Sequence, residues 1–592
     1  MRRDLKDLSK LWPWLRPSRG WLIFAVFLIP VISGVQMSLP LVLKYTIDHG
    51  IAGSDMTGLF TGAGMFLGLV VLEYVARSSQ SLASAIAVHR MIRALRRHVI
   101  GHVLKLAPSF HDRSMSGALV TRATSDFDNL SESLNMGVLT SVVDCAVLLG
   151  CLIGMFVLNW QLALIALIML PLVGWIVAAF SRGLKSAMLA ARKEIAQLNA
   201  WTQECLYGNT TIKLLNAEGE SAERYAVLNV AYRNAQMRSV VLDAMMFAVL
   251  DGIASITVGL VLWFAIMKLT GAVPIHAAVS AGVLVAFVQY VQQLFEPMKQ
   301  LGNKMAMLQG AFTSIDRVFG LLGENEFIAG SKSPPLLTGD LEFRNVSFTY
   351  RRDAPGAVAP DKSRPTLTDV SFTMRAGESL ALVGATGSGK STIIKLLTRL
   401  YDGYTGDILV SGEPLSALSP ILVRQQMAIV PQDIVLFDGS IEFNISLGTD
   451  GITREQVVAA AKLVRADRFI DRLEGTYDFQ VREQGANLSH GQRQLIAFAR
   501  ALVRRPRIIV LDEATSSIDP ESERMIQEAI DVILKGHSVI VIAHRLSTIE
   551  RCDRIVVLGN GRVLESGRHS ELLARKSAYF QLQAAAHGGN LG

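Results

Sequence analysis

Residues 378–391 read ESLALVGATGSGKS, and this stretch decides the fold of the second half of the chain. Its apolar start is typical of a strand, and the STIIKLLTRLYD after the last glycine is typical of a helix. Gly384 to Ser391 fits G-x-x-x-x-G-K-[ST], in which glycines let backbone N–H groups close around phosphate at a helix N-terminus. We therefore expect an α/β domain in which Lys390 reaches the β- and γ-phosphates of ATP and Ser391 coordinates Mg²⁺. The predicted nucleotide-binding residues of this stretch are Gly384, Ala385, Thr386, Gly387, Ser388, Gly389, Lys390, Ser391 and Thr392.

Two later strands bring acid and base candidates to one edge of the same sheet. A buried strand over 508–511 ends in Asp512 and Glu513, and a strand over 538–543 is followed by His544. Nucleotide sites in open α/β sheets gather at the carboxyl ends of the strands. We expect Asp512 to hold the metal through its hydration shell and Glu513 to polarise the attacking water. Glu513 and His544 are thus the predicted catalytic residues.

The first 300 residues have a different composition. Over the whole chain of 592 residues, 50% are hydrophobic and only 18% are charged, whereas soluble proteins carry about 25% charged residues. This balance argues against a disordered chain and against an ordinary soluble enzyme. The four cysteines are too scattered for a disulfide framework, and no CxxC pair suggests a structural zinc site.

Six apolar runs are long enough to cross a membrane, which takes about 20 residues. Residues 145–181 lack Asp, Glu, Lys and Arg, a run too long for one span, so we divide it at Asn159-Trp160-Gln161. The first run is too long for a cleaved signal and ends without a convincing cleavage site. The predicted spans are about 21–43, 58–79, 137–158, 160–181, 243–267 and 274–295.

The charges of the connections predict the orientation. Residues 1–20 hold six Lys and Arg, residues 84–136 hold seven and residues 182–242 hold eight, while the other connections hold one at most. The positive-inside rule then places both termini and both long loops in the cytoplasm. The excess of basic residues follows from this topology, and we expect no nucleic-acid partner.

Domain boundaries follow from these changes of character. We expect a transmembrane domain over 1–320, a linker rich in Gly, Pro and Ser over 321–339, and a soluble α/β domain over 340–592. The two inner loops read as long helices that turn back near 111–126 and 206–220. Such turns can carry force to a domain below the membrane.

The whole chain resembles the ATP-binding cassette (ABC) superfamily, in the order of bacterial half-size exporters, a group that contains lipid flippases and multidrug pumps. Asn487 to Gln492 (NLSHGQ) is similar to the family signature LSGGQ and lies about 20 residues before Asp512. Residues 516–519 (SSID) resemble the D-loop, and residues 481–485 resemble the exporter-specific loop. The resemblance implies a membrane α-helical fold of six spans followed by one phosphate-loop ATPase domain.

The resemblance also implies roles for particular residues. Tyr350 would stack on adenine, Gln432 would be the Q-loop glutamine near the metal, and Asp519 would belong to the nucleotide site. Each ATP would lie between the phosphate loop of one chain and the signature residues Ser489, Gly491 and Gln492 of another. The partner would be a second copy or a paralogous half-transporter. Residues 110–128 and 204–220 would be the two coupling regions.

Three positions depart from the family pattern. His490 stands where the signature usually has glycine, so we expect altered turnover. Gln484 replaces an arginine often found in the exporter loop. Residues 351–364 lengthen the segment after Tyr350, which weakens the adenine-stacking assignment.

Polar residues inside the spans are candidates for the substrate chamber. Glu73, Asp144 and Asp251 lie toward the inner half and would favour a cationic or zwitterionic amphiphile. The alternative is that Glu73 pairs with Arg77, four residues on, and that the two aspartates bond across helices. Further candidates are Gln36, Gln289, Tyr290 and Gln293.

The sequence thus predicts an ATP-driven exporter or flippase of an amphipathic lipid, drug or peptide, in a bacterial inner membrane. Three alternatives stay open: an exporter-shaped importer of a siderophore or vitamin, an anchored ABC ATPase acting on nucleic acid or ribosomes, and an ATP-gated channel. The direction of transport in vesicles would distinguish the importer.

Overall fold

The computed structural model describes residues 9–114, 116–269, 280–328, 330–333, 336–350, 365–512, 520–542 and 546–586. The chain forms two compact units. The first comprises Met1–Leu104 and Gly117–Glu324, and the second comprises Lys105–Ser116 and Asn325–Gly592. A short segment between two helices of the first unit therefore belongs to the second.

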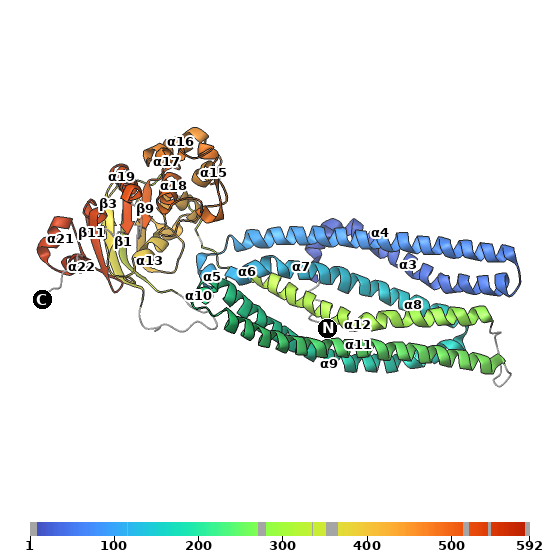
Figure 1. The fold of residues 1–592 in the computed structure, drawn as a ribbon. Helices are drawn as coiled ribbons and strands as arrows, with labels where there is room; N and C mark the ends of the chain where they lie inside the picture. Colours follow the sequence, from blue (N-terminus) through green and yellow to red (C-terminus); the bar gives the residue numbers. More distant parts are fainter. Residues whose placement is uncertain are drawn as a thin grey trace. The chain divides into compact units, whose positions relative to one another are not determined.

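The first unit is a bundle of long helices (Figure 1). Its elements are α2 (Trp12–Leu15), η1 (Arg16–Ser18), α3 (Arg19–Tyr45), η2 (Thr46–Ile51), α4 (Met56–Val103), α6 (Ser116–Ala123), α7 (Ser125–Glu132), η3 (Ser133–Leu139), α8 (Thr140–Leu158), α9 (Trp160–Tyr207), α10 (Asn209–Leu214), α11 (Glu218–Leu269) and α12 (Ala281–Gly323).

Five stretches of the described residues are helical, long and apolar enough to cross a membrane. They are Trp12–Ile51, Met56–Val103, Gly117–Leu158, Trp160–Tyr207 and Glu218–Met267. The predicted sixth span overlaps α12, whose first half carries Gln289, Gln292 and Gln293. Residues 274–279 of that span lie outside the described residues.

Asn159 separates α8 from α9, at the point where the sequence predicts a break. Its backbone is extended, and its side-chain oxygen accepts hydrogen bonds from the N–H groups of Gln161 (3.1 Å) and Leu162 (3.2 Å). An asparagine in this position satisfies N–H groups that a new helix leaves unpaired. The long uncharged run is thus two helices with a capped turn between them.

The second unit contains two larger sheets and helices around them (Figure 1). One sheet has the order β2-β1-β4-β5 and is antiparallel. The other has the order β12-β11-β3-β10-β9-β6, and all its pairs are parallel except the edge pair of β11 with β12. The strands are β1 (Leu341–Phe348), β2 (Leu367–Met374), β3 (Ser379–Val383), β4 (Thr405–Val410), β5 (Glu413–Pro414), β6 (Met427–Val430), β7 (Gly439–Ser440), β8 (Gln480–Val481), β9 (Ile508–Asp512), β10 (Ser538–Ile542), β11 (Arg554–Gly559) and β12 (Arg562–Gly567).

The helices of this unit are short. They are α5 (Pro108–Arg113), α13 (Lys390–Leu397), η4 (Leu415–Ala417), α14 (Pro420–Gln426), α15 (Ile441–Ser446), α16 (Arg454–Leu463), α17 (Asp467–Ile470), η5 (Thr476–Asp478), η6 (Glu483–Gly485), α18 (His490–Leu502), α19 (Pro520–Gly536), α20 (Leu546–Ile549), α21 (His569–Arg575) and α22 (Ala578–Ala586).

The inner parallel strands of the larger sheet, β3, β9, β10 and β11, are buried on both faces. Alternate residues of a strand point to opposite faces, and in β3 Leu380 and Leu382 join one apolar cluster while Ala381 and Val383 join another. The first cluster contains the apolar side chains of α13, and the second contains those of α18. Helices α13 and α18 therefore cover opposite faces of this sheet.

Candidate functional site

The phosphate loop follows β3 and requires glycine at three positions. Gly384, Gly387 and Gly389 have φ values of 155°, 82° and 104°. Residues that carry a Cβ atom rarely adopt such positive φ values. A Cβ atom on Gly384 would lie 2.3 Å from the carbonyl oxygen of Leu558 in β11. Gly389 is the N-cap of α13, so the loop opens directly onto the N-terminus of that helix. The loop is shaped to present backbone N–H groups to an anion.

Lys390 is the first residue of α13 and is 6% exposed. Its Nζ donates hydrogen bonds to the carbonyl oxygens of Gly384 (2.7 Å) and Ala385 (3.0 Å). Burial lowers the pKa of the Lys390 ammonium, and the charge of Asp512 opposes that shift. Lys390 and Asp512 are thus close enough to interact electrostatically.

The predicted metal ligands lie at the carboxyl ends of neighbouring strands. In β10, Ile542 pairs with Leu382 of β3 on one side and with Asp512 of β9 on the other. Val430, at the end of β6, pairs with Leu511, and the exposed Gln432 lies two residues further on. The exposed Ser391 lies in the first turn of α13. Glu513, Asp519 and His544 lie outside the described residues, so their predicted roles remain predictions.

Tyr350 lies beside the phosphate-loop helix. Its hydroxyl is 3.1 Å from Oγ1 of Thr392, and its ring packs edge to face against Tyr401 (5.0 Å between centroids). Lys395 Nζ lies 5.5 Å from the centre of the Tyr350 ring. The aromatic residue expected at adenine is therefore next to the loop, with a cation near its ring.

The signature residues form the start of α18. Ser489 is its N-cap: the side chain accepts from the N–H of Gln492 (3.2 Å), and the Gln492 side chain accepts from the N–H of Ser489 (2.9 Å). His490 is the half-buried first residue of the helix, and Gly491 is buried. Asn487 donates to the carbonyl of Gln480 in β8 and accepts from the N–H of Arg482 (3.1 Å), which ties the signature to the exporter-type loop.

In that loop Gln484 is exposed and left-handed, with φ of 60° and ψ of 25°. The backbone of any residue other than glycine is strained in this conformation. Gly485, which follows it, is held by a hydrogen bond from Arg493 (3.1 Å) to its carbonyl. The departure at Gln484 therefore falls on a strained backbone position.

The three intramembrane acids each have a basic partner. Glu73 pairs with Arg77 (3.0 Å) and accepts a hydrogen bond from Gln36 (2.8 Å). Asp251 pairs with Lys299 of α12 (2.6 Å), and Asp144 pairs with Lys304 of α12. The structure thus places these acids in ion pairs. This is the alternative hypothesis from the sequence, in which Glu73 pairs with Arg77 and the two aspartates bond across helices. The partners of the aspartates come from a helix far along the chain.

Three of the remaining chamber candidates, Gln289, Tyr290 and Gln293, lie on α12, and Gln36 lies on α3. Tyr290 is buried and donates to the carbonyl of Met37 in α3, and Gln293 accepts from the thiol of Cys151 (3.3 Å). The side-chain oxygens of Gln36 and Gln289 are buried without a hydrogen-bond partner among the described residues. These residues hold α12 against α3 and α8 and leave two acceptors unsatisfied.

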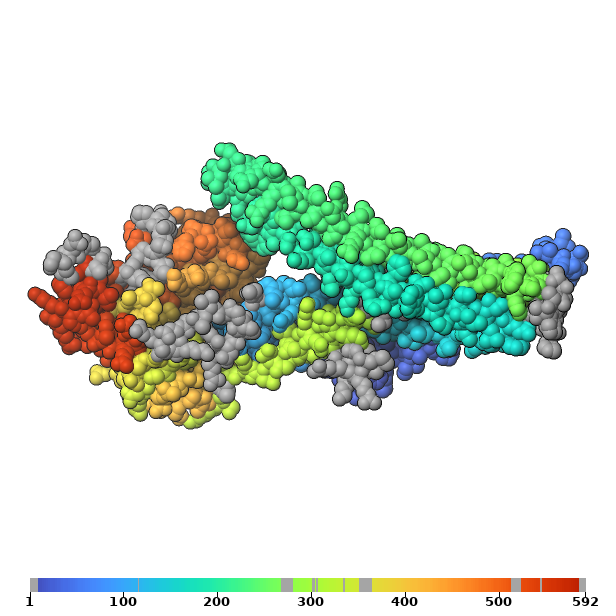
Figure 2. All heavy atoms as spheres, turned by 90° about the horizontal axis from the view of Figure 1, so that it is seen from below, coloured from blue at the N-terminus to red at the C-terminus, as the bar shows by residue number. Residues whose placement is uncertain are grey.

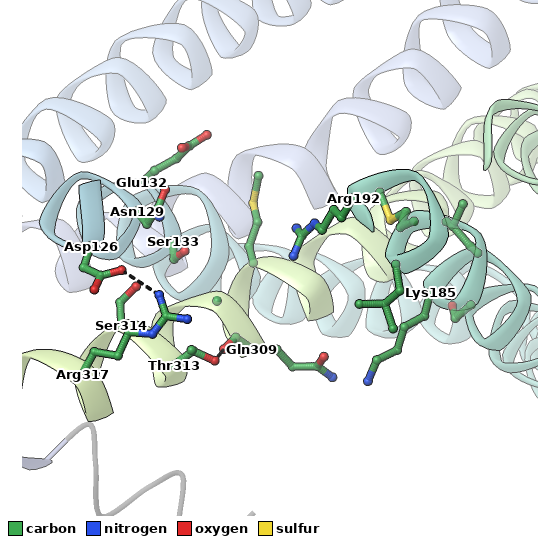
Figure 3. A pocket seen from close by; sticks show the side chains of 16 residues that line it. Asp126, Asn129, Glu132, Ser133, Lys185, Arg192, Gln309, Thr313, Ser314 and Arg317 are labelled. Atoms are coloured by element: carbon green, nitrogen blue, oxygen red, sulfur yellow. Dashed lines mark hydrogen bonds and ion pairs between the residues drawn. The ribbon is translucent and has the colours of Figure 1, made fainter. Parts of the chain in front are cut away.

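A cavity of about 600 Å³, lined by charged, polar and apolar side chains, lies between α7, η3, α9 and α12 (Figure 3). It is lined by three cations, Lys185, Arg192 and Arg317, and by two acids, Asp126 and Glu132. Asp126 is 2% exposed and pairs with Arg317 (3.3 Å), and Arg192 points from α9 toward α7 and α12. No pattern in the sequence predicts this cluster, because its members come from three helices with no shared spacing.

The second predicted coupling region, residues 204–220, carries exposed apolar side chains. Leu206, Tyr207, Leu214 and Leu215 are each between 71% and 85% exposed. Leu206 and Tyr207 end α9, Leu214 ends α10 and Leu215 follows it, at the turn between α9 and α11, which is coloured green in Figure 2. Large apolar residues clustered in this way mark an interaction surface.

Comparisons with known proteins agree with this arrangement. Residues 22–298 match the family "ABC transporter transmembrane region", and residues 367–516 match the family "ABC transporter". The chain is 32% identical over 591 residues to the ATP-dependent lipid A-core flippase of Salmonella typhimurium and to that of Escherichia coli K12. Both alignments cover 98% of this chain and 99% of the relative.

A solved structure of a bacterial Atm1-family ABC exporter with ATP bound has a similar fold. The TM-score is 0.77 at 27% identity, over 96% of this chain and 98% of that one. These matches extend through both the helical unit and the α/β unit. The chain therefore belongs to the ABC transporter superfamily, as an integral membrane protein that joins an exporter-type transmembrane domain to one ATP-hydrolysing cassette.

Proposed function

We propose that two copies of this chain form an ATP-driven flippase that moves an amphipathic lipid out of the inner leaflet of a bacterial inner membrane. Relatives named as ATP-dependent lipid A-core flippases, similar over nearly the whole length, support lipid as the substrate class. The positive-inside pattern supports a cytoplasmic cassette and cytoplasmic termini.

The positions of α13 and α18 carry the proposal of two copies. The phosphate loop opens onto α13 and the signature begins α18, and these helices cover opposite faces of one sheet. The phosphate loop and the signature residues of a single cassette therefore do not face the same γ-phosphate in any evident way. In a dimer, Ser489 and Gly491 of one copy reach the nucleotide held by Lys390 of the partner subunit.

The residues at the strand ends fit Mg²⁺. The Ser391 hydroxyl, the Asp512 carboxylate and the Gln432 amide are oxygen ligands, which this hard cation prefers. Bound there, Mg²⁺ neutralises the charge on the β- and γ-phosphates.

Glu513 supplies the remaining chemistry in this proposal. It directly follows Asp512 in the sequence and would polarise the water that attacks the γ-phosphate, with His544 as the second catalytic residue. Lys390 and the loop N–H groups hold the triphosphate in place. Closure around two ATP drives the helices only because ATP binds the closed dimer better than the open one.

The cavity between α7, α9 and α12 suggests the charge of the substrate. Its cations outnumber its acids by three to two, and Arg317 is already paired with Asp126. The structure shows no ion pair of Lys185 or Arg192 among the residues it describes, and Glu132 is the remaining acid of the lining. We infer an anionic or zwitterionic headgroup, since the intramembrane acids that would favour a cation are all ion-paired.

Proteoliposomes with a headgroup-labelled anionic phospholipid test this function. ATP added on the cassette side should move the label to the opposite leaflet, and Glu513→Gln should bind ATP but hydrolyse it at least about tenfold more slowly. Lys390→Ala should lose most ATP affinity and all transport. Movement toward the cassette side would indicate an importer, and ionic current without turnover in Glu513→Gln would indicate a channel.

A further inference from the structure

The first coupling segment, residues 105–116, is separated from the membrane helices that flank it. Helix α4 ends at Val103, residues 104–107 form a turn, and α5 ends before an extended Ser114. The segment packs within the same compact unit as the cassette, where Phe110 is buried. It can therefore move with the cassette while these breaks act as joints.

One side of the segment is held by the linker. The N–H of Ala107 donates to the carbonyl of Glu326 (2.8 Å), and Ser109 donates to the Glu326 carboxylate (3.0 Å). Arg113 pairs with the same carboxylate and holds the pKa of Glu326 below its usual value. These contacts fix where the segment sits on the cassette.

The other side is held by Tyr401, which is 9% exposed. Its hydroxyl donates to the carboxylate of Asp112 in the segment. Its ring lies edge to face against Tyr350, whose hydroxyl is 3.1 Å from Oγ1 of the buried Thr392. Thr392 lies in α13, two residues after Lys390. A chain of contacts through four side chains, Thr392, Tyr350, Tyr401 and Asp112, thus connects the phosphate-loop helix to the coupling segment.

We propose that Tyr401 is a positioning residue, whose hydrogen bond to Asp112 transmits the position of the phosphate-loop helix to the first coupling segment. Tyr401 does not touch the γ-phosphate in this account, so it should affect the turnover of the assembled transporter and leave ATP binding alone. The inference rests on the proposed function for its transport readout, but its effect on ATP turnover can be measured without a transported lipid.

The test uses the full-length protein in proteoliposomes and a double-mutant cycle. Tyr401→Phe keeps the ring packing and removes only the hydroxyl, and Asp112→Ala removes its acceptor. Each should lower kcat for ATP by about three- to tenfold with KM for ATP unchanged, because a hydrogen bond to a charged group is lost. The double variant should be no worse than either single one, since both remove the same contact.

Asp112→Asn provides the matched control. Its amide oxygen can still accept from the Tyr401 hydroxyl, so we expect kcat to recover at least in part. The proposal is overturned if Tyr401→Phe leaves kcat unchanged, if KM for ATP rises instead, or if the two effects multiply in the double variant. If the wild type hydrolyses ATP but moves no lipid, the proposed function fails while the kcat cycle still decides the role of Tyr401.

Discussion

The two segments that the sequence predicts as coupling regions are held in different ways. The segment 105–116 is part of the cassette unit, with Phe110 buried and with Asp112 and Arg113 bonded to cassette and linker residues. The region 204–220 belongs to the helical unit and exposes Leu206, Tyr207, Leu214 and Leu215. The first region therefore makes its contacts within its own chain. The second region has an exposed apolar surface that another copy of the cassette can cover.

The largest effect should come from charging the exposed region. Leu214→Asp combined with Leu215→Asp should reduce ATP-dependent lipid transport at least about tenfold, because burying each leucine contributes roughly 1.5–3 kcal/mol and a carboxylate opposes burial. The fold of the single chain should be unaffected, since both side chains are exposed in it. Thr210→Asp, on the same helix, is the matched control. Full transport by the double variant would mean that this surface docks nowhere.

A smaller, local effect separates the two regions directly. Phe110→Ala should loosen residues 105–116, because removing a buried phenylalanine costs about 3–5 kcal/mol. Tyr207→Ala should leave residues 204–220 as they are without nucleotide, since Tyr207 is 85% exposed. Hydrogen exchange of the purified protein measures both. If each variant changed the hydrogen exchange of its own region to the same extent, the two regions would not differ in how they are held.

The smallest effect concerns the loop beside the signature. Gln484→Gly should stabilise the cassette by about 1 kcal/mol, because glycine adopts the left-handed backbone of this position without strain. Gln480→Gly in β8 should instead destabilise it, since glycine weakens a strand. Chemical denaturation followed by fluorescence would compare the two. A loss of stability in Gln484→Gly would show that the glutamine side chain makes a needed contact.

Short-range patterns in the sequence predicted the local structure around several candidate nucleotide-binding residues, while the roles of Glu513, Asp519 and His544 stay predictions. The glycines of the phosphate loop, the strand that ends in Asp512 and the capped start of α18 each depend on a few adjacent residues, so the local sequence specifies them. The apolar runs were equally readable, because membrane spanning depends on composition. The ABC membership expected from these motifs is confirmed by the comparisons.

Contacts between distant residues could not be predicted in this way. Lys304 and Asp144 are 160 positions apart, and nothing in either neighbourhood indicates the other. The pairing of Arg113 with Glu326 joins a loop of the first half to the linker, so the assignment of residues 105–116 to the cassette appears only in three dimensions. The cluster of Asp126, Lys185, Arg192 and Arg317 likewise brings together residues that are distant in the sequence, so it could not be predicted from local patterns.

Mixed dimers test the composite nucleotide site most directly. Ser489→Asp keeps an N-cap acceptor for Gln492 but places a negative charge toward the γ-phosphate. One preparation pairs a Lys390→Ala chain with a Ser489→Asp chain, and the other pairs a chain carrying both changes with a wild-type chain, each isolated by two affinity tags. If two copies share each ATP, the first mixture keeps one intact site and hydrolyses ATP, while the second has none. Hydrolysis by the second mixture and not by the first would contradict the account, because each site would then lie within a single chain.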